Sequence, residues 1–361
     1  MKIIAYALAL TAFLSMAQTN ERTRFEKISD YPYGLPTFFN KNDGWASAGS
    51  SGLRVTRDGG VTWRPVPLPK PANMDEPSIN GLFFVSKLEL WLVLEPRHAD
   101  HPGHGGTLYR TFDAGATWQE DQLPREDWWH QTGLASYSRG SAVWFGGEKG
   151  LASPPRPGQT NRTGHVVFAC EATIFHRATQ GGPWIRQTLP TLKGCEVWLI
   201  RFFDNKRGLA VTDSTIYFTE DAGAHWAESE VKMRRPAPLW RDVEPERPET
   251  LQFLEGDERI GWLGFEEGDV YKTTDGGKHW RQIVERGQYS VGLGGFGQWG
   301  AVYFATEKTG WLLDGGHVFE TRDGGEHWSR LQGPKRITTL TGAGGTCWVS
   351  GEDALYRLAW R

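Results

Sequence analysis

The chain has 361 residues, with 40 lysine and arginine residues against 43 aspartate and glutamate residues and a formal net charge of −3. This balance gives no support to non-specific nucleic-acid binding, which depends on a surplus of basic residues. Tryptophan occurs 18 times, far above its ordinary frequency, and a length of about 340 residues after removal of a leader fits one large all-β domain.

Residues 1–17 have the features of a secretory signal peptide. Lys2 precedes an apolar run from Ile3 to Leu14, and Ser15-Met16-Ala17 has the small-x-small pattern of a cleavage site. The run is shorter than the roughly 20 apolar residues of a membrane span. We therefore expect residues 18–361 to form a single exported domain, periplasmic or secreted, without stable membrane insertion. A retained N-terminal anchor is the alternative.

One pattern, Thr-x-Asp-x-Gly-x-x-Trp, then recurs along the chain. Its five complete copies are Thr56, Asp58, Gly60, Trp63; Thr111, Asp113, Gly115, Trp118; Thr219, Asp221, Gly223, Trp226; Thr273, Asp275, Gly277, Trp280; and Thr321, Asp323, Gly325, Trp328. A degenerate copy between the second and the third keeps only Gly181 and Trp184, with Arg177 and Thr179 at the other two places.

Each residue type in the pattern has a mechanical reason to be there. The aspartate accepts hydrogen bonds from backbone N–H groups just ahead of it, and the glycine adopts a conformation that a Cβ would penalise. The threonine ends an incoming strand, and the tryptophan begins an outgoing strand and buries its ring. The unit is therefore a stapled hairpin, and we interpret these residues as structural rather than catalytic.

The spacing of the repeats predicts a β-propeller. Successive tryptophans are between 42 residues (Trp184 to Trp226) and 66 residues (Trp118 to Trp184) apart, close to the length of a four-stranded blade. In the first blade the expected strands are Leu35–Phe39, Gly44–Gly49, Leu53–Arg57 and Trp63–Val66. In the sixth they are Ala301–Ala305, Gly310–Asp314, His317–Thr321 and Trp328–Leu331.

Segments at the two ends of the chain together form the last predicted blade. Three strands are expected after Trp328, namely Ile337–Thr341, Thr346–Gly351 and Ala354–Leu358, and no fourth follows them. The segment Arg24–Ile28 precedes the first blade, and its pairing with Ala354–Leu358 closes the ring, which removes exposed sheet edges. The predicted fold is an all-β, seven-bladed β-propeller.

The blade pattern resembles the Asp-box (bacterial neuraminidase) repeat, and more specifically the photosystem II assembly and stability factor family of seven-bladed propellers. The segments that carry the resemblance are GWASAGSSGLRVTRDGGVTW, GWLGFEEGDVYKTTDGGKHW and GWLLDGGHVFETRDGGEHW. The resemblance covers roughly residues 24–361. It implies a non-enzymatic protein that docks a protein partner, acting as a scaffold or assembly factor, without a cofactor. The chain departs from that family by long insertions at 95–106, 148–168 and 233–250.

Two other functions remain open at this stage: a glycosidase- or sialidase-like hydrolase, and a carbohydrate-binding, lectin-like module. Sialidases begin their arginine trio with a Phe/Tyr-Arg-Ile-Pro motif in the first inner strand, where this chain has Leu35-Pro36-Thr37-Phe38-Phe39 without an arginine. A hydrolase also requires a pair of carboxylates about 5–10 Å apart, which the sequence does not locate. We expect no catalytic residue, and a monomer.

The long connections lead to a candidate binding face. Loops between the second and third strands, and between blades, emerge on the side opposite the repeated turns, and unequal loops on a rigid scaffold commonly carry binding. Tryptophan and arginine are enriched at interface hot spots. The candidate partner-binding residues are Trp128, Trp129, Arg234, Arg235, Trp240 and Arg241. The alternative is that these rings form a local core under their own loops.

The cysteines and one histidine-rich loop bear on two further questions, whether a disulfide forms and whether a metal ion binds. Cys170 and Cys195 fall near one face of the disc, so a disulfide is plausible in an oxidising compartment, with free thiols as the alternative. Cys347 is expected to be a buried thiol. His98, Asp100, His101 and His104 share one loop, but that loop lacks the rigid frame that fixes metal ligands, so we expect no metal there.

Overall fold

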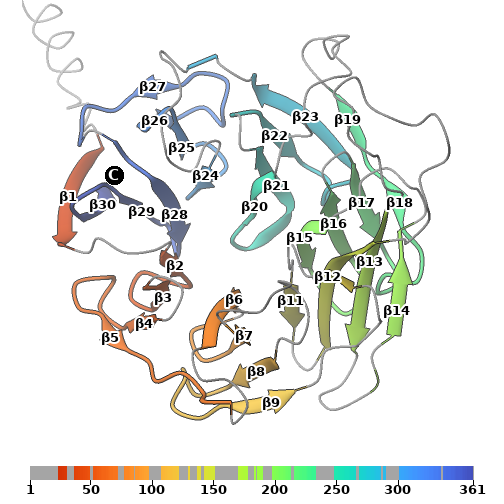
Figure 1. The fold of residues 1–361 in the computed structure, drawn as a ribbon. Helices are drawn as coiled ribbons and strands as arrows, with labels where there is room; N and C mark the ends of the chain where they lie inside the picture. The colour runs from red at the N-terminus through yellow and green to blue at the C-terminus, as the bar shows by residue number, and fades with distance from the viewer. Residues whose placement is uncertain are drawn as a thin grey trace, which may run out of the picture.

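The computed structural model is a ring of antiparallel sheets around a central axis (Figure 1). It describes residues 23–30, 36–48, 52–71, 77–84, 86–96, 107–121, 129–130, 136–139, 142–150, 170–177, 183, 185–189, 197–212, 215–232, 248–265, 268–285, 288–289, 301–334 and 336–360. In each sheet one strand lies toward the axis and the other strands lie progressively outward. This is the architecture of a β-propeller.

The first two sheets follow the predicted order. The strands of the first are β2 (Pro36–Phe38), β3 (Gly44–Ser47), β4 (Leu53–Thr56) and β5 (Arg64–Pro65). Those of the second are β6 (Pro77–Phe84), β7 (Leu90–Pro96), β8 (Thr107–Thr111) and β9 (Gln119–Asp121). In both, each strand pairs with the next one along the chain, as expected of a hairpin-connected blade.

Three later sheets repeat this order. One contains β15 (Val197–Phe202), β16 (Gly208–Thr212), β17 (Ile216–Thr219) and β18 (Ala227–Glu228). The next contains β20 (Pro248–Leu254), β21 (Asp257–Phe265), β22 (Val270–Thr273) and β23 (His279–Val284), with β19 (Glu230–Lys232) added in parallel to β23. The third contains β24 (Ala301–Phe304), β25 (Gly310–Asp314), β26 (His317–Thr321) and β27 (Ser329–Arg330).

The last sheet joins the two ends of the described chain. It contains β28 (Thr339–Ala343), β29 (Thr346–Ser350) and β30 (Leu355–Ala359), and β1 (Arg24–Ser29) pairs antiparallel with β30. The predicted closure of the ring by the N-terminal strand is confirmed. The predicted start of β28 at Ile337 is wrong by two residues, because the backbone N–H of Ile337 donates to Gly316 O in the neighbouring sheet.

The remaining sheet differs from the others. It contains β10 (Trp129–His130), β11 (Ser136–Arg139), β12 (Ala142–Gly150), β13 (Cys170–Arg177) and β14 (Ile185–Thr188), and both β10 and β11 pair with β12. This sheet holds the degenerate repeat, which lacks the threonine and aspartate that staple the other turns. The prediction of seven equivalent blades is therefore corrected: the described residues form six regular blades and this irregular sheet.

In the core, phenylalanine rings pack directly over glycines of the neighbouring strand. Phe38, Phe202, Phe253 and Phe304 lie at or one residue before the end of the innermost strands of four regular blades, and each pairs in register with a glycine of the second strand: Gly44, Gly208, Gly261 and Gly310. A Cβ on any of these glycines would lie 2.5–2.7 Å from the phenylalanine ring, closer than van der Waals contact allows. The glycine therefore makes room for the ring.

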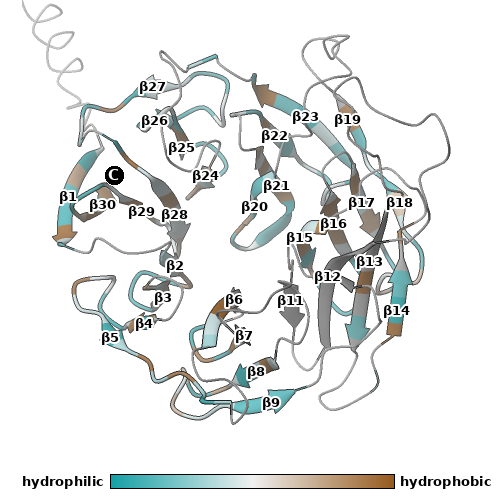
Figure 2. Ribbon diagram, in the orientation of Figure 1, coloured by the Kyte–Doolittle hydropathy of each residue, from teal (hydrophilic) through white to brown (hydrophobic). Residues whose placement is uncertain are grey.

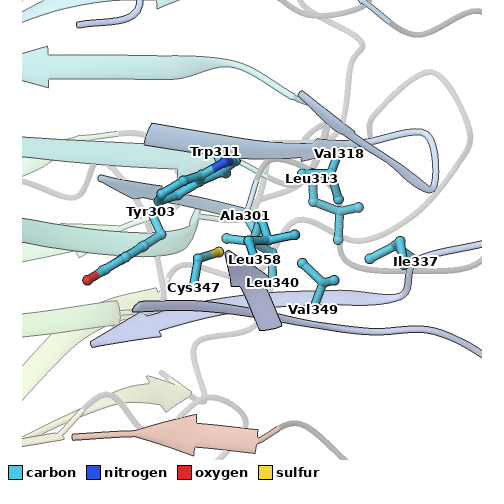
Figure 3. Packing of buried hydrophobic residues seen from close by; sticks show 10 residues of the cluster. All are labelled: Ala301, Tyr303, Trp311, Leu313, Val318, Ile337, Leu340, Cys347, Val349 and Leu358. Carbon is cyan, nitrogen blue, oxygen red and sulfur yellow. The ribbon is translucent and has the colours of Figure 1, made fainter. Parts of the chain in front are cut away.

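Tryptophans fill the space between blades. Trp45, Trp91, Trp262, Trp311 and Trp348 lie on second strands and are fully buried. The Trp262 ring stacks on Phe304 of the next blade with centroids 4.0 Å apart. Figure 3 shows the comparable junction of the last two blades, where Tyr303 and Trp311 of one sheet face Leu340, Cys347 and Val349 of the other. Outer strands such as β5, β9 and β14 are largely hydrophilic (Figure 2). The core therefore lies between blades.

A side-chain amide also links two blades. The Gln252 side chain donates from Nε2 to Phe304 O at 2.7 Å and accepts from the Phe304 N–H through Oε1 at 2.8 Å. This pair of bonds imitates a strand ladder between β20 and β24. The innermost strands of neighbouring blades are thereby held at a fixed distance around the axis.

Candidate functional site

The five complete repeats form the same hydrogen-bonded turn, here called the Thr-Asp turn. In the first, Asp58 Oδ1 accepts from the Thr56 hydroxyl at 2.8 Å and from the backbone N–H of Thr62 at 2.9 Å. Thr56 Oγ1 accepts in turn from the backbone N–H of Gly60 at 3.0 Å. Two side chains therefore satisfy the backbone donors of a tight loop, as the residue pattern predicts.

The second carboxylate oxygen is also occupied, by one of two residue types. Thr62 and Thr117 donate their hydroxyl groups to Asp58 and Asp113 in the first two turns, at 2.5 and 2.6 Å. A histidine Nδ1 occupies the same place in the other three turns, at 2.5–2.7 Å from Oδ2 of the aspartate: His225, His279 and His327. Each aspartate is thus engaged at both oxygens.

These hydrogen bonds depress the pKa values of the carboxyl groups. The Thr117 side chain and backbone N–H lower the pKa of Asp113 to about 2, and those of His225 do the same for Asp221. Burial raises the pKa of Asp323, but hydrogen bonds from His327 outweigh it and bring the pKa to about 2. A carboxyl group that stays ionised and fully bonded is unsuited to general acid catalysis. The geometry of the turns is that of structural staples.

The glycine of the repeat pattern, two residues after the aspartate, faces the preceding sheet in each turn. Gly60, Gly115, Gly223, Gly277 and Gly325 have φ between +81° and +96°. A Cβ at these positions would lie 2.2–2.7 Å from a side chain of that sheet, respectively Leu355, Val66, Gln187, Leu209 and Ile283. Both the backbone conformation and the close approach require glycine. Each turn therefore locks its own hairpin and also packs against its neighbour.

The repeated turns define one face of the ring, here called the turn face. In four regular blades, backbone N–H groups of the Thr-Asp turn donate to carbonyl groups in the turn between the first and second strands: Asn42, Leu88, Lys206 and Lys308. Ion pairs then join neighbouring sheets on this face, including Lys278 with Glu220 and Arg281 with Glu326, both at 2.8 Å. Each exposed pair contributes at most about 1 kcal/mol.

The opposite side, here called the loop face, carries the other connections. Because the strands of a blade alternate in direction, the connections from second to third strand and from blade to blade emerge there. Four of these connections, after β7, β9, β12 and β19, span 97–106, 122–128, 151–169 and 233–247. These spans lie outside the described residues. The described strands that precede them end on the side opposite the Thr-Asp turns.

The predicted binding residues fall largely in those spans. Trp128, Arg234, Arg235, Trp240 and Arg241 lie outside the described residues, and Trp129 is described only as a backbone position in β10. The histidine-rich loop with His98, Asp100, His101 and His104 also lies outside them. The structure therefore leaves the grouping of these side chains as a prediction.

The cysteine predictions divide in the same way. Cys347 in β29 is a buried free thiol, as predicted, and burial raises its pKa well above the usual value. Cys170 begins β13 rather than lying in the preceding connection, because β13 pairs with β12 as far as Gly150. Cys195 lies outside the described residues, so a Cys170–Cys195 disulfide stays a prediction.

A buried arginine on the turn face was missed from the sequence. Arg110 in β8 is 3% exposed, and its Nε and Nη2 donate to Glu89 Oε1. Its guanidinium carbon lies 4.2 Å from the centroid of Trp91 and 4.1 Å from that of Phe112. The residue sits one position before the threonine of the repeat, and Tyr109, Arg110 and Thr111 are all buried, so strand alternation does not single it out. Its charge concealed that role.

Among the described residues, no group of three or more histidine, cysteine, aspartate or glutamate side chains is placed to hold a metal ion. Within the same residues, no helix is long and apolar enough to span a membrane.

Comparison with known proteins identifies the fold. No protein-family model and no curated protein matches the chain. Among solved structures, YCF48 bound to D1 peptide is similar over 96% of this chain and 97% of its own, with 17% identity and a TM-score of 0.57. YCF48 from Cyanidioschyzon merolae covers 92% of this chain and 98% of its own, at 15% identity and a TM-score of 0.54.

A third structure extends the comparison. The WD40 beta propeller domain of Doa1 is 11% identical over 93% of this chain and 97% of its own, with a TM-score of 0.53. Identities this low establish shared architecture and no more. The protein is an all-β β-propeller, and two of the structures similar to it are of YCF48.

Proposed function

We propose that this protein is a non-enzymatic β-propeller that binds a protein partner through its loop face, as a scaffold or as an assembly or stability factor. Its irregular sheet then counts as a seventh blade of an Asp-box propeller. The protein acts as a monomer outside the cytoplasm, in the periplasm or the medium, after removal of residues 1–17.

One structural observation carries this proposal: the two faces of the ring are used differently. On the turn face, each aspartate of a Thr-Asp turn has both carboxylate oxygens engaged within its own turn. The strands β7, β9, β12 and β19, which long connections follow, all end on the opposite side. A rigid ring with unequal loops on one side is a common frame for binding.

The comparisons support a protein as the ligand. One similar structure is of YCF48 with a D1 peptide. A propeller that is similar to this chain over nearly its whole length therefore binds a peptide. The candidate contact residues on the loop face are Trp128, Trp129, Arg234, Arg235, Trp240 and Arg241. Both residue types are frequent at interface hot spots.

The test compares two variants of the tagged mature protein as bait in the envelope fraction of cells that make it. One variant replaces Trp128, Trp129 and Trp240 by alanine. The matched control replaces Val61, Ile185 and Val231 by alanine, since these apolar side chains of the described residues are 37–54% exposed. We expect the tryptophan variant alone to lose a partner that the wild type captures, while both variants keep the wild-type melting temperature.

Three results would contradict the proposal. A partner retained equally by all three baits would place binding away from these tryptophans. Turnover of sialosides or β-glucan oligosaccharides by the wild type, abolished by replacing a pair of loop-face carboxylates, would establish a hydrolase instead. Capture of oligosaccharides without turnover would point to a lectin-like module.

A further inference from the structure

The second blade exposes an apolar spot of two large side chains on the turn face, Leu88 and Phe112, where the first blade exposes one such side chain, Val61. Phe112 occupies the variable position of the Thr-x-Asp segment and is 37% exposed. The same position holds polar residues in the other four complete repeats: Arg57, Glu220, Thr274 and Arg322. Since the five turns share one backbone structure, this difference belongs to the side chain alone.

The neighbouring turn shows a second replacement of the same kind. Leu88 is 43% exposed, and its carbonyl accepts from the backbone N–H of Ala114 at 2.9 Å. The carbonyl groups that make the equivalent bond in other blades belong to Asn42, Lys206, Arg259 and Lys308. Leu88 and Phe112 therefore lie on two turns joined by that hydrogen bond. Two positions of this blade on the turn face are therefore apolar where the equivalent positions of the other blades are polar.

The layer beneath Phe112 is rigid. Its ring covers the buried guanidinium of Arg110, which lies between Phe112 and Trp91 and is bonded to Glu89. Trp91 Nε1 also donates to Glu89 Oε1 at 3.0 Å. The outer part of the Phe112 ring is thus presented on a buried support held by the ion pair of Arg110 with Glu89. An ordered aromatic side chain loses little conformational entropy on binding.

Two exposed cations and one exposed carboxylate lie around the spot, and the carboxylate, that of Asp113 next to Phe112, is held by Thr117 within its own turn. Lys87 precedes Leu88 and is 52% exposed, and Arg57 is 45% exposed. Both pair with Asp43, which is only 15% exposed, at 3.6 and 2.9 Å. Glu89 is 14% exposed and is engaged by Arg110. Two cations therefore lie beside the apolar spot, and Asp43, the carboxylate that pairs with both, is largely buried.

We propose that Leu88, Phe112, Lys87 and Arg57 form a docking site on the turn face for a peptide segment of a protein partner. The segment presents an aromatic or leucine side chain next to acidic side chains. The apolar side chain covers Leu88 and Phe112, and the carboxylates approach Lys87 and Arg57. This site is separate from the loop face and stands independently of the function proposed for it.

The test uses a phage-displayed library of random 12-residue peptides, selected on the wild-type protein and counter-selected on a double variant. The double variant, L88N and F112T, gives this blade the residues that other blades carry as Asn42 and Thr274. We expect enriched peptides to combine an aromatic or leucine residue with aspartate or glutamate. As synthetic fluorescent peptides, they should bind the double variant at least tenfold more weakly than the wild type.

A second variant guards against a folding defect, since Phe112 covers a buried charge. Lys87→Glu alters an exposed side chain at the rim, and it should weaken the same peptides at least fivefold at unchanged melting temperature. The affinity should also fall as the salt concentration rises. Enrichment of basic peptides, equal binding by the wild type and both variants, or no sequence selective for the wild type would each overturn the proposal.

Discussion

The indole ring of Trp348 lies parallel to the phenyl ring of Phe38, with centroids 3.8 Å apart and planes 8° apart. The two residues are near opposite ends of the chain, in the last sheet and the first. Trp348 Nε1 also donates to Gly59 O in the Thr-Asp turn of the first sheet at 3.1 Å. One side chain therefore joins the two blades that meet where the ring closes.

Replacing Trp348 by alanine should destabilise the protein strongly. Trp348 is fully buried, and large-to-alanine changes in a core cost roughly 3–5 kcal/mol. Trp348→Phe keeps the stacking surface and loses the bond to Gly59, so it should cost about half as much. Urea denaturation followed by tryptophan fluorescence measures both. Equal stability of W348A and the wild type would show that the ring does not depend on this junction.

The side-chain amide of Gln252 joins two other neighbouring blades through polar contacts. Gln252→Met keeps the side-chain length but leaves the Phe304 N–H and C=O without the two bonds that the amide makes. Because unsatisfied buried polar groups cost about 1–3 kcal/mol each, we expect a loss of about 2–4 kcal/mol. Gln119→Met, at an exposed position of β9, is the control and should change stability little. A similar effect of both substitutions would contradict the assignment.

The repeats made the fold predictable because a repeated pattern reports one local structure several times. The strands β25 and β26 were predicted with the observed bounds, and β1 was placed to within one residue. The turns were predictable because Thr, Asp and Gly act on their own backbone, within four residues of one another. The sheet with the degenerate repeat was predicted as an ordinary blade, because no local sequence pattern indicated that both β10 and β11 would pair with β12.

Contacts between blades were not predictable in the same way. The stacking of Phe38 on Trp348 and the bonds of Gln252 to Phe304 join residues that are far apart in the sequence, and no spacing rule connects them. The phenylalanine before each second-strand glycine was visible in the sequence, but its meaning depends on register. The loop-face candidates stay predictions, because they were inferred from residue type and loop length alone.

Two of the Thr-Asp turns hold an alanine in a strained, left-handed backbone conformation, and replacing it by glycine should stabilise the protein. Ala114 and Ala222 have φ values of 62° and 65° where the other three turns have Gly59, Gly276 and Gly324. Because a Cβ is unfavourable in this region, Ala222→Gly should raise the free energy of unfolding by up to about 1 kcal/mol. Ala224→Gly, two residues further on, lacks a positive φ and should instead lower stability by about 0.5–1 kcal/mol. Opposite signs in thermal denaturation are the expected result.

The ionised aspartates of the Thr-Asp turns should make stability depend on acid pH. The pKa values of Asp221 and Asp323 in the folded protein are about 2, whereas an unfolded chain has about 3.9. A depressed pKa contributes stability that is complete above the unfolded value and is lost as pH falls through the folded one. The wild type should therefore lose stability between about pH 4 and pH 2.

A double variant isolates this contribution from the general acid sensitivity of the protein. D221N and D323N keep a side-chain oxygen for the backbone N–H groups of His225 and His327 but have no carboxylate to protonate. The variant should be less stable than the wild type at pH 7, and the difference should shrink between pH 4 and pH 2 because the wild-type carboxylates become neutral there. Urea midpoints at pH 7, 5, 4, 3 and 2 measure it. A constant difference at every pH would mean that these side chains act through shape and neutral hydrogen bonds rather than through charge.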